Sequence, residues 1–164
     1  MAVTTEKSTQ ETARTATPPT KMAGHEYNGQ MRVFRFNFTQ GAAAGDANSL
    51  ANLVTLPGGR YRLLKRLSNL NCSAFGAART LDIGYLAHTK QDGTAVSASV
   101  DTIADGLDVS ALATLACGNA ANALTADPDI LFDSKEGVTI QAKVLGDTIP
   151  VGATLKGEFV VVPE

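Results

Sequence analysis

Residues 129–162 read DILFDSKEGVTIQAKVLGDTIPVGATLKGEFVVV, and this stretch decides the fold. Apolar positions alternate with polar ones on both sides of a loop that contains Gly146 and Pro150. A period of two is typical of a strand that buries one face. The stretch therefore predicts two antiparallel strands, preceded by a short strand over 130–133. The positions on the predicted buried faces are Val138, Ile140, Ala142 and Val144, then Leu155, Gly157, Phe159 and Val161.

Further strands are expected between residue 31 and this stretch. The clearest is 31–39, where Phe34, Phe36 and Phe38 share one face. A hairpin-type turn at 91–93 leads into what we interpret as a long surface loop through residue 108. Residues 118–127 carry no clear pattern. The remaining predicted strands are 49–56, 60–71, 79–87 and 109–117, the last of which is also compatible with a helical turn.

About eight short strands with glycine- and proline-rich turns, and no long helix, predict an all-β fold. We expect an antiparallel β-sandwich that is jelly-roll-like, while an immunoglobulin-like strand order remains open. The length of 164 residues suits one such domain over 31–164 and a tail over 1–30.

The tail differs in composition from the rest. It is rich in threonine, its charges balance, and Pro18 and Pro19 interrupt any helix. It holds too little apolar surface to offset its ordering entropy, so we expect an extended or disordered N-terminal arm over 1–30. Fully stretched, such an arm reaches roughly 90–100 Å at about 3.3 Å per residue. Met22 and Tyr27 are its candidate anchors on a neighbouring protein, and a plain flexible leader is the alternative.

The overall composition excludes several classes of function. The net charge of -2 and the neutral arm argue against nucleic-acid binding. The sequence shows neither a secretion leader nor an apolar run of 18 residues, so neither secretion nor a membrane partner is expected. Cys72 and Cys117 make no disulfide framework, and we expect two free, packed thiols.

A catalytic or metal-binding constellation is not evident either, and we expect neither an enzyme nor a cofactor. His25 and His88 are far apart and lack clustered partners, which disfavours a metalloenzyme of the cupin type. Asp101, Asp105 and Asp108 offer oxygen ligands for calcium, but their spacing does not match an EF-hand loop. Acidic side chains in such a pattern more often lie on the surface in contact with water than bind calcium.

Two groups of residues are candidates for a protein interface. Arg60, Arg62 and Arg66 form a basic cluster with few aromatic neighbours, which favours an acidic protein partner over single-stranded nucleic acid. Val160 and Val162 lie opposite Phe159 and Val161 in the alternation, so the last strand is apolar on both faces. Such a strand is either covered by another subunit or lies centrally in the sandwich.

Three stretches resemble the decoration or cement proteins on the head exterior of tailed bacteriophages. They are GAARTLDIG (76–84), ADGLDVS (104–110) and TIPVGATLKG (148–157). The resemblance implies a jelly-roll module, commonly trimeric, that clamps adjoining subunits of the major capsid protein. It also implies a structural protein of the virion, on the capsid exterior after assembly in the host cytoplasm.

A receptor- or glycan-binding module of a head spike or tail fibre is the alternative. That function calls for exposed aromatic side chains, and the chain has three tyrosines and no tryptophan.

Overall fold

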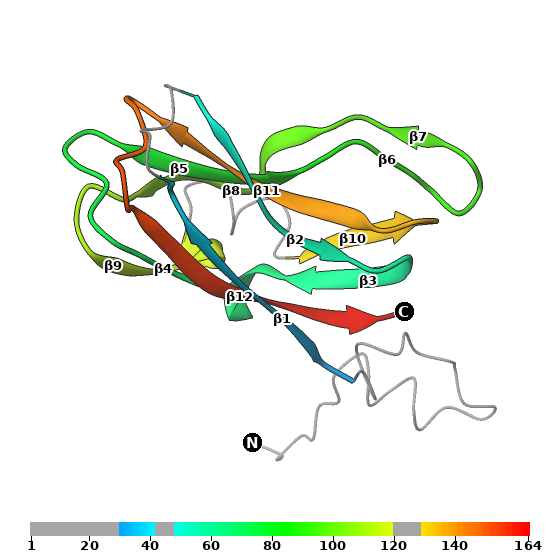
Figure 1. Ribbon diagram of the computed structural model, residues 1–164. Helices are drawn as coiled ribbons and strands as arrows, with labels where there is room; N and C mark the ends of the chain where they lie inside the picture. Colours follow the sequence, from blue (N-terminus) through cyan, green and yellow to red (C-terminus); the bar gives the residue numbers. More distant parts are fainter. Residues whose placement is uncertain (1–29, 42–47, 120–128) are drawn as a thin grey trace, which may run out of the picture.

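A computed structural model describes residues 30–41, 48–119 and 129–164. Over these residues the protein is a sandwich of two antiparallel sheets, with a small hairpin that extends from one end (Figure 1). The predicted all-β sandwich is thus confirmed. The described elements are β1 (Arg32–Thr39), β2 (Leu50–Leu56), β3 (Gly59–Leu64), η1 (Lys65–Leu67), β4 (Asn69–Cys72), β5 (Thr80–Tyr85), β6 (His88–Thr89), β7 (Ala95–Val96), β8 (Ser99–Asp108), β9 (Ala113–Ala116), η2 (Cys117–Asn119), β10 (Asp129–Ser134), β11 (Val138–Leu145) and β12 (Thr154–Pro163).

The first sheet has six strands arranged around β12. On one side β12 pairs along its length with β1, which is an edge strand. On the other side it pairs with β4 through its first half and with β3 through its end. β3, η1 and β4 act as one strand interrupted by a single 3-10 turn, and they pair outward with β10 and β9 respectively.

The second sheet has the order β2-β11-β5-β8, and together the two sheets show a nested pairing. The first strand pairs with the last, β1 with β12, and β2 pairs with β11. The interrupted strand β3–β4 pairs with β10 and β9, and β5 pairs with β8. A long hairpin folded over itself in this way is a jelly roll, which distinguishes it from the immunoglobulin-like order.

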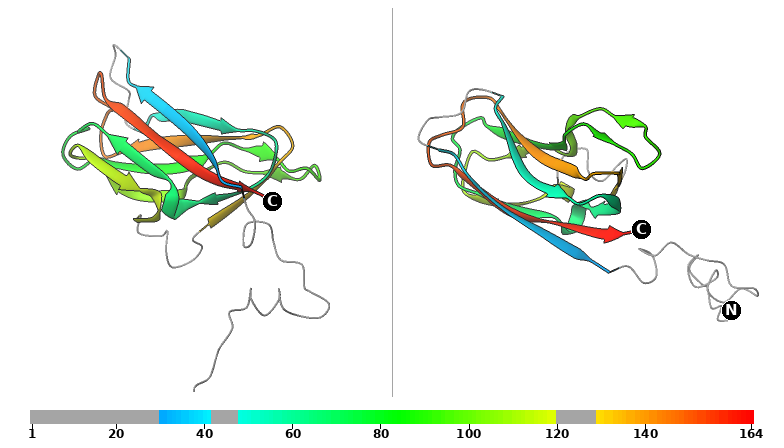
Figure 2. Two further views of the ribbon diagram at one scale, coloured as in Figure 1. Left: turned by 90° about the horizontal axis from the view of Figure 1, so that it is seen from below. Right: turned by 45° about the vertical axis from the view of Figure 1, so that its right-hand side comes forward.

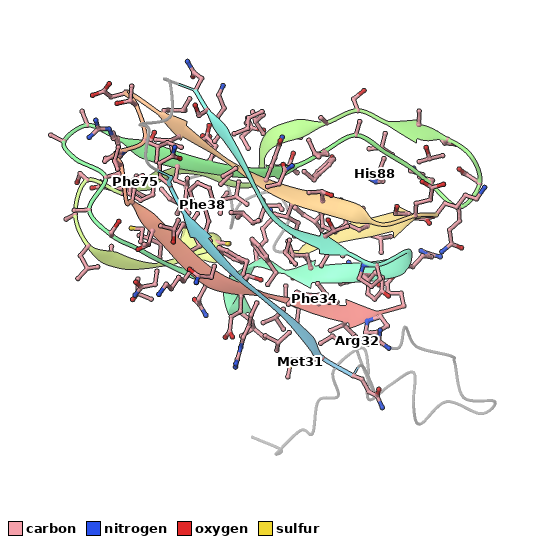
Figure 3. All side chains as sticks on the ribbon, viewed as in Figure 1. Met31, Arg32, Phe34, Phe38, Phe75 and His88 are labelled. Atoms are coloured by element: carbon pink, nitrogen blue, oxygen red, sulfur yellow. The ribbon has the colours of Figure 1, made fainter. Side chains whose placement is uncertain are left out.

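The hydrophobic core fills the space between the two sheets. Phe36 of β1 stacks on Phe159 of β12 with ring centroids 5.2 Å apart, and Phe34 and Phe38 pack beside them (Figure 3). Because the side chains alternate along each strand, Leu155, Phe159 and Val161 face inward from β12. Burial of each such side chain contributes about 1.5–3 kcal/mol.

Two segments depart from the expectation. The hairpin-type turn predicted at 91–93 joins β6 to β7, but the surface loop predicted after it contains β7 and the ten-residue strand β8. β8 was missed because bulges interrupt its pairing with β5, so its apolar side chains do not keep a period of two. The expected strand 109–117 is shortened to β9, and the unassigned segment 118–127 lies mostly outside the described residues.

Gly84 is required where β8 crosses close to β5. A Cβ atom at this position would lie 2.0 Å from the carbonyl oxygen of Ser99. Any side chain at position 84 would push the two strands apart, so this close approach of the two backbones requires glycine.

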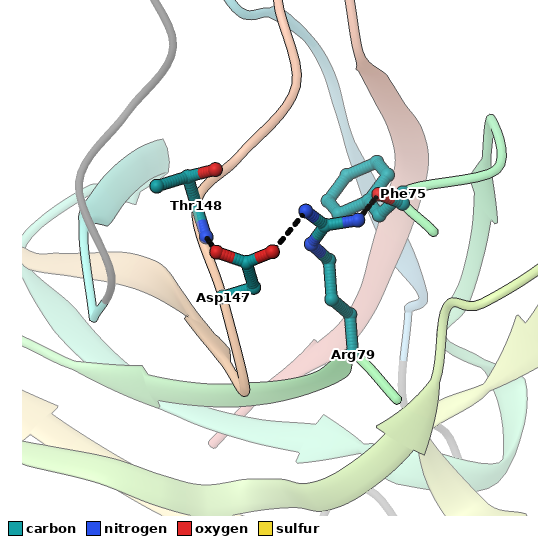
Figure 4. Close-up of polar contacts among 4 residues, drawn as sticks. All are labelled: Phe75, Arg79, Asp147 and Thr148. Carbon is teal, nitrogen blue, oxygen red and sulfur yellow. Dashed lines mark hydrogen bonds and ion pairs between the residues drawn. The ribbon is translucent and has the colours of Figure 1, made fainter. Parts of the chain in front are cut away.

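A polar contact joins the loop after β11 to the loop before β5 (Figure 4). Arg79 donates to Asp147 with an N–O distance of 2.7 Å and also to the carbonyl of Phe75. The other oxygen of Asp147 accepts the backbone N–H of Thr148 at 2.7 Å. These bonds fix two of the stretches that carry the resemblance to phage decoration proteins.

Candidate protein–protein interface

The outer face of the six-stranded sheet divides into two halves of different chemistry. Near the start of β1 and the end of β12 its side chains form rows of apolar residues. We call this the apolar half; its members are Met31, Val33, Leu64, Leu131, Val160 and Val162. At the other end of the same strands lies the polar half, whose members are Arg35, Asn37, Asn69, Asn71, Thr114, Lys156 and Glu158.

The pairing register builds the apolar half from four strands that are distant in sequence. Val33 of β1 lies opposite Val160, and Leu131 of β10 lies opposite Arg62 of β3. Arg62 in turn lies opposite Val162, so this row crosses the sheet from β10 to β12. Continuing the β1 register by one residue places Met31 beside Val162.

Three of the six side chains in the apolar half are exposed to solvent. Met31 is 62% exposed, Val33 51% and Leu131 42% (Figure 3 labels Met31 at the start of β1). Met31 and Val33 are successive outward positions at the start of β1, and Leu131 is separated from them by Arg62 and Val162. Exposed apolar side chains gathered on one face of a sheet are typical of a contact site. β1 is also an edge strand, so its outer backbone groups are open to a further strand.

Val160 and Val162 are only 6% and 3% exposed, although they lie outside the core between the sheets. β12 is a central strand, and neighbouring strands on both sides shield its outward side chains. The backbone N–H of Val160 donates to the hydroxyl of Ser68 at 3.1 Å, and Ser68 donates to the carbonyl of Leu64 at 2.9 Å. These two valines therefore form the floor of the apolar half, while Met31, Val33 and Leu131 form its exposed part.

The basic cluster seen in the sequence is only partly brought together. Arg60 and Arg62 point to the outer face of β3 and share Glu164, at 3.6 Å and 2.6 Å respectively. Arg66 lies in η1 and is exposed, whereas Lys65 beside it is 4% exposed. Arg62 lies between Leu131 and Val162 on this face, and its charge is paired with Glu164.

The polar half satisfies its own side chains. Arg35 forms an ion pair with Glu158 at 3.5 Å, and Asn71 donates to the hydroxyl of Thr114 at 3.1 Å. A shallow hollow of about 350 Å³ lies over Arg35, Asn71 and Lys156. Phe36 and Leu70 also line this hollow, so it combines polar side chains with apolar ones.

The sequence analysis found part of this surface. It singled out Val160 and Val162, and it named Arg62 separately as part of the basic cluster. It missed Met31 and Val33, although both alternate with the three phenylalanines of β1 and so had to face outward. Leu131 carried no such signal, because only the β10–β3 pairing brings it to this face. The candidate anchors Met22 and Tyr27 lie outside the described residues.

The described residues show no candidate metal centre. They contain no cluster of three or more His, Cys, Asp or Glu that would hold a metal ion, and Asp101, Asp105 and Asp108 of β8 form none. Cys72 and Cys117 are free and buried, as expected. Burial raises the pKa of the Cys117 thiol to about 12 and raises that of Cys72 as well, so both stay protonated at neutral pH. Within the described ranges, no helix is long and apolar enough to cross a bilayer.

Comparisons with known proteins give likenesses of fold. The sequence matches no protein-family model and no curated protein. A chain of the cyanophage Pam1 capsid asymmetric unit aligns over 88% of this chain and 92% of its own length, with 12% identity and a TM-score of 0.45.

Two chains from infectious bursal disease virus also align with this protein. The Gt strain structure aligns over 84% of this chain, with 8% identity and a TM-score of 0.45. The VP2 subviral particle also aligns over 84% of this chain, with 11% identity and a TM-score of 0.42. The protein spans about a third of those two chains, 32% and 33%. At these identities no residue or role is transferred from them.

Proposed function

We propose that this protein is a viral structural protein that binds and stabilises the outer surface of a tailed-phage head. The observation that carries the proposal is the apolar half, an exposed apolar surface beside an open strand edge on a jelly roll. Its partner in the proposal is the major capsid protein, and its location is the exterior of the virion. The resemblance of three sequence stretches to phage decoration proteins supports this assignment.

The physical basis is linkage between binding and stability. A protein that binds the assembled shell better than free subunits stabilises the shell by mass action. Burial of Met31, Val33 and Leu131 against a capsid subunit supplies an apolar contact, and the paired charges around Arg62 form its polar rim.

Residues 1–30 extend the proposed contact. The arm joins the domain at Met31, which is itself part of the apolar half, so in this proposal the arm starts from the apolar surface and reaches outward to a neighbouring subunit. Met22 and Tyr27 are the proposed anchors. Several copies in a trimer bind with higher avidity than one copy, because each further contact is made at high effective concentration.

The test uses phage heads that lack the protein. Purified full-length protein is added to expanded heads, and bound copies per head are measured by sedimentation together with the temperature at which the heads release their DNA. We expect saturable binding and a higher release temperature. Analytical ultracentrifugation of the free protein tests the trimer separately.

A matched pair of variants locates the contact. Val33→Asp places a charge in the apolar half, and Asn37→Asp places the same charge in the polar half on the same strand. Loss of binding in Val33→Asp alone supports the proposal. Equal binding by both variants, or no binding of the unaltered protein to heads, overturns it.

A further inference from the structure

A second site lies at the end of the sandwich, where the β6–β7 hairpin stands beside β10 and β3. It is a pocket of about 320 Å³, less open than the hollow over the polar half. The hairpin contributes His88 and Lys90, β3 contributes Arg60, and β10 contributes Asp133. The hairpin extends beyond the two sheets (Figure 2), and Figure 3 shows His88 on it. A volume of this size is in the lower range of small-molecule sites.

The base of the pocket is an aromatic cluster. Tyr85 contacts His88 edge to face, with ring centroids 5.5 Å apart, and Phe132 at 5.3 Å. Phe132 is buried, and His88 is further held by its Nδ1 atom, 3.3 Å from the carbonyl of Leu86. The rings therefore give the pocket a rigid wall on which a pyranose ring can pack.

Hydrogen bonds hold the hairpin against the sheet. The N–H of Lys135 donates to the carbonyl of Thr89 at 2.9 Å, and the N–H of Gln91 donates to Asp133 at 3.4 Å. Within the hairpin, the N–H of Lys90 donates to the carbonyl of Thr94 at 2.8 Å. The pocket is thus largely formed before a ligand arrives, which lowers the entropic cost of binding.

The charges in the pocket favour an anion. Arg60 and Lys90 supply two cations, and Asp133 supplies one carboxylate. Arg60 is held only loosely, since Glu164 lies 3.6 Å from it and 2.6 Å from Arg62. Among the described residues no carboxylate oxygen lies within 4.0 Å of the Lys90 ammonium nitrogen. The nearby Asp92 carboxylate interacts with Lys90 electrostatically without forming an ion pair at this distance.

From this arrangement we propose that the pocket binds a carboxylate-bearing saccharide, a uronic acid residue. Its carboxylate lies between Arg60 and Lys90, where two cations satisfy it. Its hydroxyl groups donate to Asp133, and its ring packs on the wall of Tyr85 and His88. A neutral sugar would leave Lys90 without a carboxylate, and a simple carboxylate would add no hydroxyl donor to Asp133, whose only donor named above is the N–H of Gln91 at 3.4 Å. The site is separate from the apolar half except at Leu131, which borders both.

The test is a chemical-shift titration of the full-length ¹⁵N-labelled protein. The probes are sodium glucuronate, sodium galacturonate, glucose and sodium acetate at equal ionic strength. We expect saturable shifts in residues 88–96 and 131–133 with at least one uronate. Glucose and acetate should each bind at least 10-fold more weakly.

Two variants and a matched control assign the binding to the pocket. Lys90→Ala and Arg60→Gln should each weaken uronate binding about 10-fold, while Lys156→Ala, which removes an exposed lysine of the polar half, should leave it unchanged. Circular dichroism and thermal melting confirm that each variant is folded. The proposal is overturned if neither uronate binds saturably, if acetate or glucose binds as tightly, or if Lys90→Ala and Lys156→Ala behave alike. Shell binding by Lys90→Ala, measured in parallel, reports on the apolar half and is expected to be unaffected.

Discussion

The apolar and polar halves of the outer face are made by the same strands, yet they differ in what they leave unsatisfied. In the polar half Arg35 pairs with Glu158 and Asn71 donates to Thr114, so neighbouring side chains meet part of its polar groups. In the apolar half Met31 and Val33 are exposed and have no described layer above them. The two halves share one sheet geometry, so the difference between them comes from the side chains at the outward positions.

The largest expected effect concerns the core that both halves share. Phe159 faces inward against Phe36, and Val160, its neighbour in sequence, faces outward. Phe159→Ala should lower the free energy of unfolding by about 3–5 kcal/mol. Val160→Ala should cost clearly less, because it removes fewer buried atoms. Urea unfolding of both variants measures the difference, and equal losses would contradict the larger contribution assigned to Phe159.

The second prediction compares the two halves directly. Met31→Asp combined with Val33→Asp should weaken binding to phage heads about 30-fold or more, the effect of losing an apolar hot spot. Asn37→Asp combined with Asn71→Asp adds the same charge to the polar half and should change binding less than threefold. Because all four positions are exposed, thermal melting should differ little among the variants. A larger loss from the polar-half pair would reverse the comparison.

A third prediction extends the comparison to the outer face of the other sheet, where a carboxylate is buried. Asp82 is 5% exposed and accepts the N–H of Gly106 at 2.9 Å. Burial raises the pKa of Asp82 above its usual 3.8, with Asp105 and Asp101 adding to the rise. In the pH range between these two pKa values the folded state binds more protons than the unfolded state. Stability therefore falls as pH rises through this range.

Asp82→Asn keeps an oxygen for Gly106 and removes the charge. Its free energy of unfolding should depend less on pH just above pH 3.8 than that of the unaltered protein. It should also be the more stable of the two at pH 7, as measured by denaturant unfolding at a series of pH values. A stronger pH dependence in the variant would contradict this account.

The smallest effect is expected in the polar half. The Arg35–Glu158 pair is exposed, with the Arg35 side chain 83% accessible. Exposed pairs contribute about 0–1 kcal/mol, and salt screens them. Arg35→Gln should thus change the melting temperature by little, and 1 M salt should reduce the difference further. A substantial, salt-independent loss would mean that Arg35 has a structural role beyond this pair.

The sequence predicted elements where alternation is regular and failed where pairing is irregular. β1, β11 and β12 were found because their buried faces repeat every second residue. β8 was missed because bulges shift its register against β5, so that Ile103 and Ala104 are both buried although they are adjacent. The expected single strand over 60–71 contains η1, a 3-10 turn in its middle.

The candidate sites were less predictable than the strands. Val160 and Val162 were identified because one strand carried apolar residues on both faces. Leu131 joins them only through the β10–β3 pairing, which also places Asp133 opposite Arg60. His88 meets these two only because the hairpin stands beside β10. No local pattern encodes such meetings, since each depends on contacts between segments far apart in the chain.

The sequence by itself determined that this chain forms strands with one buried face, that its thiols are apolar packing groups, and that the end of the chain is apolar on both sides. These properties follow from the local period of two and from composition, which act on neighbouring residues. The tertiary structure alone decided the nested strand pairing, the division of the outer face into two halves, and the pocket under the hairpin. The physical reason is that register and sheet order arise from the packing of the whole core, in which β1 meets β12 across most of the sequence.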